Sequence, residues 1–254
     1  MSLVPDGTPL VLLNAFPVDR AQWDPLLDAL PVLPGDIITF DVPGIGDMPL
    51  PEEEPSLELI ADAAVLAMRE VTGRDKAVWV GCSMGGYIAM AVAERHPEAV
   101  AGIGLLGTRS TADTDEAREA RLALAERVDG AEGHPDARGA AEGLVGTRDD
   151  ARDALVAAVA ANIARHGGDG IAWGQRAMAA RPDRTAVLEA LDVPAFVAVG
   201  EHDAIAGVDA ARTMAEALGV EAEVLAGVGH LSAWEAPERV AALVAGLVDR
   251  ADAG

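Results

Sequence analysis

Six short apolar runs, separated by stretches with helical periodicity, restrict the fold of this chain more than any other feature. Such nearly continuous apolar runs are typical of parallel strands that are covered on both faces of a sheet. The chain therefore favours an α/β fold with one mainly parallel sheet of about six strands and helices on both faces. The predicted strands span 9–16, 36–43, 76–82, 100–108, 195–203 and 220–227.

The stretch 56–72 shows the helical periodicity clearly. Ser56 is the expected N-cap and Gly73 the expected end of this helix. Its sheet-facing apolar side chains should be Leu57, Ile60, Ala61, Ala64, Met68 and Val71. A last helix begins near Pro237 and carries an apolar stripe of Val240, Leu243, Val244 and Leu247.

The segment between Thr108 and the strand at 195 contains no strand-like run. It carries helical patterns at 114–128, 136–145, 149–165 and 169–181. We therefore predict a helical cap at 109–190, inserted into a core domain made of 1–108 and 191–254.

The charge balance limits the partners that this chain can bind. It has 19 basic and 42 acidic residues and a net charge of −23, which repels nucleic acid and anionic lipid surfaces. The N-terminus does not resemble a signal peptide, and no apolar run approaches the ~18 residues of a membrane span. The one cysteine, Cys82, cannot form an internal disulfide. These features predict a cytoplasmic protein with no nucleic-acid or membrane partner, and leave the oligomeric state open.

The stretch GCSMG at 81–85 joins a predicted strand to a predicted helix and matches the pattern G-x-S-x-G. In this sharp turn the central serine is held in a strained conformation with its hydroxyl exposed. Gly81 and Gly85 are needed because the turn brings these positions too close for side chains. The pattern predicts Ser83 as a nucleophile.

A serine hydroxyl needs a base to take its proton and an acid to fix the tautomer of that base. His230 lies in the loop between the last strand and the last helix, and Asp203 ends the strand before it. All three residues follow parallel strands at their carboxyl ends, where open α/β sheets place their sites. We therefore predict a triad of Ser83, Asp203 and His230.

Other residues could fill two of these roles. The alternative bases are His96, His134, His166 and His202, and the alternative acids are Glu201, Asp192 and Asp113. Cys82 is off-centre in the turn and is expected to be a packed apolar residue.

Attack on a carbonyl also requires donors where negative charge develops. The backbone N–H of Met84, at the start of the helix, is one candidate. The second should come from the turn after the first strand, and by position it is the N–H of Phe16.

These motifs together resemble those of the α/β-hydrolase superfamily. The resemblance extends through Asn14-Ala15-Phe16-Pro17, Trp23, DVPGIG at 41–46, the GCSMG turn, Asp203 and His230. Asn14 and the stretches 107–128 and 177–203 are similar to bacterial members of the 3-oxoadipate enol-lactonase and carboxylesterase type. Two departures are noted: Asn14-Ala15 stands where the family has His-Gly, and the N-terminal antiparallel hairpin of the family is expected to be missing or vestigial.

The resemblance implies a serine hydrolase that cleaves a small ester, lactone or thioester through an acyl-enzyme, with no metal or organic cofactor. Trp173 and Met178 are candidates for lining the pocket under the cap, or else for packing within the cap; Arg176 or Arg109 could meet a substrate carboxylate. The alternatives are perhydrolysis, C–C bond hydrolysis or a lyase reaction on the same scaffold, and a ligand-sensing protein with little turnover.

Overall fold

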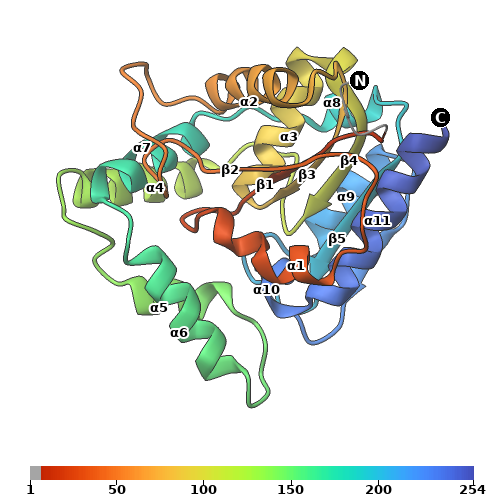
Figure 1. The fold of residues 1–254 in the computed structure, drawn as a ribbon. Helices are drawn as coiled ribbons and strands as arrows, with labels where there is room; N and C mark the ends of the chain where they lie inside the picture. The colour runs from red at the N-terminus through yellow and green to blue at the C-terminus, as the bar shows by residue number, and fades with distance from the viewer. Residues whose placement is uncertain (1–6) are drawn as a thin grey trace.

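One sheet of six parallel strands forms the centre of the computed structural model, which describes residues 7–254 (Figure 1). The strand order is β2-β1-β3-β4-β5-β6. The bounds are β1 (Leu10–Leu13), β2 (Ile37–Phe40), β3 (Ala77–Cys82), β4 (Val100–Leu106), β5 (Ala195–Gly200) and β6 (Ala222–Leu225). Each strand lies within a predicted run, so the predicted parallel sheet is confirmed. Within residues 7–254 the sheet has no antiparallel strand, as expected for a missing hairpin.

The strand register brings the ends of the central strands to one edge of the sheet. Leu13 of β1 pairs with Gly81 of β3, and Cys82 pairs with Leu106 of β4. The segments that follow β1, β3 and β4 therefore leave the sheet side by side. This edge is where the candidate catalytic residues are positioned.

Alternate strand side chains enter two separate cores, one on each face of the sheet. Val11 and Trp79 belong to one core, and Leu10 and Val80 belong to the other. Helices α2 (Leu57–Thr72), α3 (Met84–Arg95) and α9 (Val208–Ala217) cover the first face, and α1 (Asp24–Ala29) and α11 (Pro237–Ala253) cover the second. Short helices η1 (Arg20–Trp23), η2 (Pro97–Ala99) and α10 (Ser232–Glu235) complete the core.

Helix α2 begins and ends where its sequence predicts. The Ser56 hydroxyl accepts hydrogen bonds from two backbone N–H groups of the first turn, and Gly73 adopts a left-handed φ of 66°. The expectation for Val71 was wrong, because its side chain is 69% exposed. Successive residues of a helix are rotated by about 100°, so the buried face shifts gradually along the sequence, and Thr72 takes the last buried position in place of Val71. The Thr72 hydroxyl donates to the carbonyl of Met68.

All the regular secondary structure between β4 and β5 is helical. Its helices are α4 (Asp115–Val128), α5 (Ala137–Leu144), α6 (Arg152–Ile163), α7 (Gly168–Ala179) and α8 (Thr185–Glu189). Helix α4 packs against α7, and α5 against α6. Figure 1 shows α5 and α6 projecting away from the sheet. The cap boundaries at 109 and 190 stay a prediction.

A substitution at Gly85 would test the close contact between the turn after β3 and strand β1. A Cβ atom at Gly85 would lie 2.0 Å from the carbonyl oxygen of Leu13, which is fixed in β1. We expect Gly85→Ala to lower the free energy of unfolding by about 3 kcal/mol, because backbone must move to admit the methyl group. In urea unfolding followed by circular dichroism, the control Gly246→Ala should raise it by about 0.5–1 kcal/mol, because Gly246 lies in the open interior of helix α11. A wild-type unfolding midpoint for Gly85→Ala would contradict this account of the turn.

Candidate active site

Ser83 occupies a strained turn between β3 and α3. It has φ 53° and ψ −114°, and among the residues described it alone has a positive φ without being glycine. Its N–H donates to Leu106 at 2.9 Å, and its carbonyl accepts from Gly86 N–H at 3.0 Å and from the Thr108 hydroxyl at 2.7 Å. A conformation of this kind costs on the order of 1–3 kcal/mol and persists only when surrounding structure enforces it. These hydrogen bonds, which involve the end of β4 and the first turn of α3, supply that enforcement.

The two glycines of the turn are there for steric reasons. A Cβ atom at Gly81 would lie 2.2 Å from the carbonyl oxygen of Gly85. The N–H of Gly85 donates to the carbonyl of Asn14 at 3.1 Å, so the turn also contacts the loop after β1. The close approach predicted from the pattern is confirmed at both positions.

Asp203 and His230 form a buried hydrogen-bonded pair. His230 Nδ1 lies 2.9 Å from Asp203 Oδ2, and the two side chains are 2% and 0% exposed. Asp203 Oδ1 accepts the N–H groups of Ile205 and Ala206, each at 2.9 Å. Because Asp203 accepts the proton on Nδ1, His230 Nε2 is the nitrogen left to act as a base.

The pKa of Asp203 is the result of opposing effects. Burial works to raise the pKa, but the hydrogen bond and charge of His230, with the N–H groups of Ala206 and Ile205, bring it below its usual value. Asp203 therefore stays ionised near neutral pH, the form that orients and stabilises a charged imidazole.

The end of β4 brings Ser83 and the Asp203–His230 pair together. A Cβ atom at Gly107 would lie 2.9 Å from Asp203 Oδ2 and 3.4 Å from His230 Nδ1, and the next residue, Thr108, holds the carbonyl of Ser83. Cys82, which precedes Ser83, directs its thiol to the carbonyl of His230 at 3.7 Å. Within the described part of the chain, Ser83 Oγ forms no hydrogen bond with His230 Nε2. The catalytic roles of the three residues stay predictions.

Several of the alternative bases and acids are engaged elsewhere. His96 bonds to Asp62, His134 accepts from the N–H of Asp136, and His166 lies between Gly46 and Asn162. Glu201 accepts from Gly227, and Asp113 pairs with Arg121 and Arg181. Cys82 is fully buried, and burial raises its pKa to about 12, so it stays a protonated thiol.

The predicted oxyanion donors have free N–H groups. Within residues 7–254, neither Phe16 nor Met84 donates its N–H to a backbone or side-chain acceptor. Met84 is the first residue of α3, where helix geometry leaves the N–H unpaired. Both residues are buried, with 6% exposure at Phe16 and 0% at Met84, and their role as oxyanion donors stays a prediction.

Asn14 holds the loop after β1. Its buried side-chain amide donates to the carbonyls of Val18 at 2.5 Å and Ala15 at 3.2 Å. The N–H of Ala15 donates to the buried Gln22 Oε1 at 2.7 Å. The departure from the family pattern at Asn14 thus preserves an ordered loop around the N–H of Phe16.

The predicted lining residues differ in their surroundings. Trp173 and Met178 are buried in the same apolar cluster as Phe16, and Trp173 Nε1 has no hydrogen-bond partner among the described residues. Arg176 instead pairs with Asp129 at 2.5 Å, on a part of the cap where both side chains are exposed. Arg109 donates to the carbonyl of Ile205. Both arginines are thus occupied by partners within the chain.

Glu235, a residue that no sequence motif singled out, fixes the loop before His230. Its Oε2 atom accepts the N–H of Gly229 at 3.0 Å, that of Gly146 at 2.9 Å and both N–H and hydroxyl of Thr147 at 2.7 and 2.8 Å. The N–H of His230 donates to Leu144 at 3.0 Å. One carboxylate therefore joins the histidine loop to the segment after α5.

No group of three or more His, Cys, Asp or Glu side chains in the described residues could hold a metal ion. Nor is any helix of residues 7–254 both long and apolar enough to span a membrane.

The chain matches the family model described as alpha/beta hydrolase fold over residues 8–132. It is 30% identical over 250 residues to 2-succinyl-6-hydroxy-2,4-cyclohexadiene-1-carboxylate synthase from Enterobacter sp. (strain 638), an alignment that covers 93% of this chain and 90% of that protein.

Two solved structures are similar over nearly the whole chain. A thermophilic esterase from Thermogutta terrifontis, with malate bound, has a TM-score of 0.90 and 29% identity and covers 97% of this chain and 91% of its own. The enol-lactonase from Burkholderia xenovorans LB400 has a TM-score of 0.80 and 24% identity, with coverages of 96% and 91%. At that identity the second similarity shows the fold alone.

Glu235→Ala should destabilise the protein by about 3 kcal/mol, because it leaves buried N–H groups without an acceptor. The exposed neighbour Glu238 is the control, and Glu238→Ala should change the free energy of unfolding by less than about 1 kcal/mol. Urea unfolding of both variants measures the difference, and equal losses would contradict the role given to Glu235.

Asp203→Asn should destabilise the protein more at neutral pH than in acid. A carboxyl whose folded pKa lies below its unfolded value contributes stability above the unfolded value, 3.8, and loses it as the pH falls through the folded pKa. The difference in unfolding free energy between wild type and variant should therefore begin to narrow only below about pH 5, and go on narrowing as the pH falls through 3.8 and the lower folded pKa. Urea unfolding across this range measures it, and a difference independent of pH would show that the charge of Asp203 is not what stabilises the pair.

Proposed function

Because the chain belongs to the alpha/beta hydrolase fold family, we propose that it is a serine hydrolase that cleaves a small carboxylic ester, lactone or thioester. The single observation that carries the proposal is the buried Asp203–His230 pair beside the strained turn at Ser83. The similarity to the Thermogutta esterase supports hydrolysis as the reaction class.

In the proposed acylation, Ser83 Oγ attacks the substrate carbonyl carbon while His230 Nε2 takes the hydroxyl proton. The carbonyl oxygen becomes an oxyanion, which accepts hydrogen bonds from the N–H groups of Phe16 and Met84. As the intermediate collapses, His230 returns the proton to the leaving alcohol or thiol. In a lactone this group stays attached to the acyl chain. The product of this half-reaction is an ester on Ser83.

In the proposed deacylation, water attacks the acyl carbon and gives a proton to His230 Nε2, and the second tetrahedral intermediate uses the same donors. Collapse releases the acid and returns the proton to Ser83 Oγ. Asp203 stays ionised throughout and stabilises the charged imidazole without taking its proton. These steps require no metal or organic cofactor.

The surroundings of the cap residues are largely apolar, although Arg121 Nη1 lies 3.4 Å from Met178 Sδ. Trp173 and Met178 share an apolar cluster with Phe16 and would place apolar surface near the oxyanion donors. Arg176 pairs with Asp129, so the geometry gives no support to its predicted role in binding a substrate carboxylate.

One observation favours a second reaction class. The Enterobacter relative that aligns over nearly the whole chain is named as a synthase, not as an esterase. Lyase chemistry is therefore the second candidate, in which His230 would act as a base on the substrate and Ser83 would form no acyl-enzyme.

The decisive variant is Ser83→Ala. We expect wild type to turn over 4-nitrophenyl esters from acetate to octanoate, or a lactone, many times per molecule, and Ser83→Ala to lower kcat at least ~10³-fold. A fluorophosphonate should label wild type at Ser83, and mass spectrometry of the labelled peptide would locate the adduct. The phosphonate also counts active sites. Many turnovers per active site would distinguish the hydrolase from a ligand sensor that reacts once.

The matched control is Ser56→Ala, which removes the N-cap hydroxyl of α2 at a distance from the site. It should cost about 1 kcal/mol of stability and leave kcat within about 2-fold. If folded wild type hydrolyses no ester, thioester or lactone and takes up no phosphonate, the serine hydrolase proposal is wrong. The expected cytoplasmic location and the exclusion of nucleic-acid and membrane partners stay predictions.

A further inference from the structure

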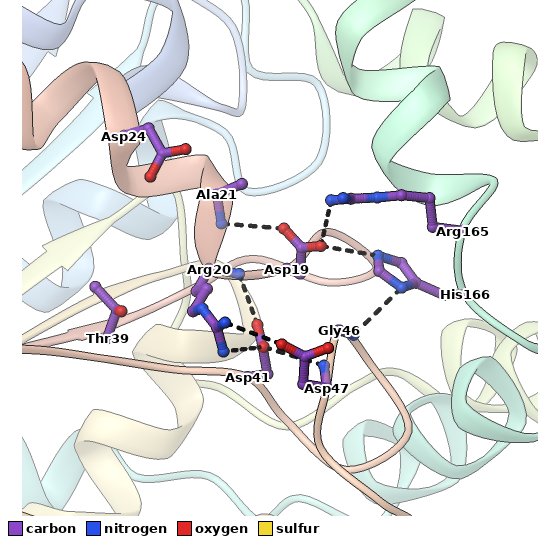
Figure 2. A pocket seen from close by; sticks show the side chains of 10 residues that line it. All are labelled: Asp19, Arg20, Ala21, Asp24, Thr39, Asp41, Gly46, Asp47, Arg165 and His166. Carbon is purple, nitrogen blue, oxygen red and sulfur yellow. Dashed lines mark hydrogen bonds and ion pairs between the residues drawn. The ribbon is translucent and has the colours of Figure 1, made fainter.

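A polar cavity lies between the loop after β1 and the end of cap helix α6, and both segments contribute to its wall. It has a volume of about 380 Å³, and Figure 2 shows that its lining side chains come from three segments of the chain. Asp19 and Arg20 follow β1, Asp41 and Asp47 follow β2, and Arg165 and His166 follow α6. Its wall therefore joins the cap to the loop that carries the Phe16 N–H.

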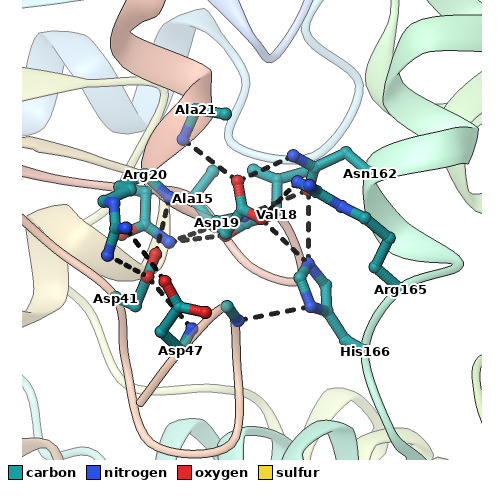
Figure 3. Close-up of polar contacts among 12 residues, drawn as sticks. Ala15, Val18, Asp19, Arg20, Ala21, Asp41, Asp47, Asn162, Arg165 and His166 are labelled. Carbon is teal, nitrogen blue, oxygen red and sulfur yellow. Dashed lines mark hydrogen bonds and ion pairs between the residues drawn. The ribbon is translucent and has the colours of Figure 1, made fainter.

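Two hydrogen bonds between the buried residues Asn162 and Asp19 cross this junction (Figure 3). The N–H of Asp19 donates to Asn162 Oδ1 at 3.1 Å, and Asn162 Nδ2 donates to Asp19 Oδ1 at 2.8 Å. Both residues are buried, with 5% and 6% exposure. We call this pair the Asn162–Asp19 clasp. An amide matches a backbone N–H and a carboxylate at once because it carries both an acceptor and a donor.

The clasp acts on a loop that side-chain hydrogen bonds of Asn14 and Gln22 hold in place. Asn14 Nδ2 bonds to the carbonyl of Val18, next to Asp19, and Gln22 Oε1 holds the N–H of Ala15, next to Phe16. Displacing Asp19 would therefore also displace the peptide that presents the Phe16 N–H.

A second cap helix contacts the same loop on the ring of Phe16. A Cβ atom at Gly174 of α7 would lie 2.3 Å from Phe16 Cε2, so only glycine admits this approach. The apolar residues Val159 and Ile163 of α6 belong to the same buried cluster as Val18. Both helices thus pack on the loop, and Asn162 alone of these contacts fixes a backbone N–H of the loop by a buried hydrogen bond.

Neighbouring charged groups support the clasp without replacing it. Arg165 pairs with Asp19 Oδ2 at 2.5 Å, but its side chain is 59% exposed, where ion pairs contribute little. His166 Nδ1 accepts from Gly46 N–H at 3.3 Å, so Nε2 carries the proton and faces Asn162 Oδ1 at 3.3 Å. Burial lowers the pKa of His166, which keeps this arrangement neutral.

We propose that Asn162 is a positioning residue, supplied by the cap, that sets the Phe16 N–H for oxyanion binding through Asp19. The proposal rests on the serine hydrolase function proposed above. It makes the cap a structural part of the oxyanion hole.

The first test is Asn162→Ala, with Arg165→Ala as the control that touches the same carboxylate. Active sites are counted by phosphonate titration, so that unfolded protein does not enter kcat. Asn162→Ala should lower kcat about 10-fold to 100-fold and leave KM within about 3-fold, because a donor is displaced but not deleted. Arg165→Ala should leave both constants within about 3-fold. Unchanged kcat per active site in Asn162→Ala, even with reduced stability, would overturn the proposal.

The second test is Asn162→Asp, which sets a carboxylate against Asp19, beside Arg165 and His166, with Arg20 and Asp41 in the same cavity. At about pH 8 its kcat should fall at least as far as that of Asn162→Ala. The ratio of its kcat to wild-type kcat should rise toward about pH 5, because one of two facing carboxyls then binds a proton and can donate again. Division by the wild-type value cancels the pH dependence that the two proteins share, and a ratio independent of pH would contradict the donor role of the amide.

A third measurement separates failure of the clasp from failure of the hydrolase proposal. The amide resonance of Phe16, followed by ¹H–¹⁵N spectroscopy, should shift and exchange faster with solvent in Asn162→Ala than in Arg165→Ala or wild type. If wild type neither hydrolyses esters nor takes up phosphonate, the hydrolase proposal fails, and this resonance alone decides the clasp. An unchanged Phe16 amide in Asn162→Ala would overturn the clasp whatever the activity.

Discussion

The backbone of Ser83 is the constraint on which the rest of the site depends. A positive φ at a residue with a side chain is unfavourable, and here β1, β3 and β4 together impose it. Gly85 lies against the carbonyl of Leu13, and Thr108 holds the carbonyl of Ser83. The same contacts fix the segments that carry Asn14 and Gly107, and through Gly107 they reach His230 and Asp203. The contacts that strain the backbone of Ser83 are thus the same contacts that order the loops after β1 and β4.

The sheet could be predicted because its signal is local. A strand that is buried on both faces must be apolar along its whole length, and each run shows this without reference to its neighbours. The steric demand at Gly81 is equally local, because a Cβ atom there would meet Gly85, whereas the demand at Gly85 comes from Leu13 in β1. Val71 shows the limit of periodicity, since a drift of one position over four turns moved burial from Val71 to Thr72.

The missed residues depend on partners far along the chain. Glu235 contacts Thr147, 88 residues away, and Asn162 contacts Asp19, 143 residues away. No local pattern encodes such a pair. A weak signal existed for Asn162, a single amide in the otherwise apolar stretch at 154–163, where a buried polar side chain requires a partner. For Glu235 the sequence offers only its position five residues after His230.

Three side chains hold the loop that carries the Phe16 N–H, namely Asn14, Gln22 and Asn162, and all three are amides. An amide neither gains nor loses a proton in the physiological range, so these supports keep the same hydrogen-bonding capacity in acid and in base. A histidine at Asn14, the residue type of the family pattern, would have brought a titrating ring into this loop. In this chain the three side chains that hold the loop bring no titrating group of their own into it.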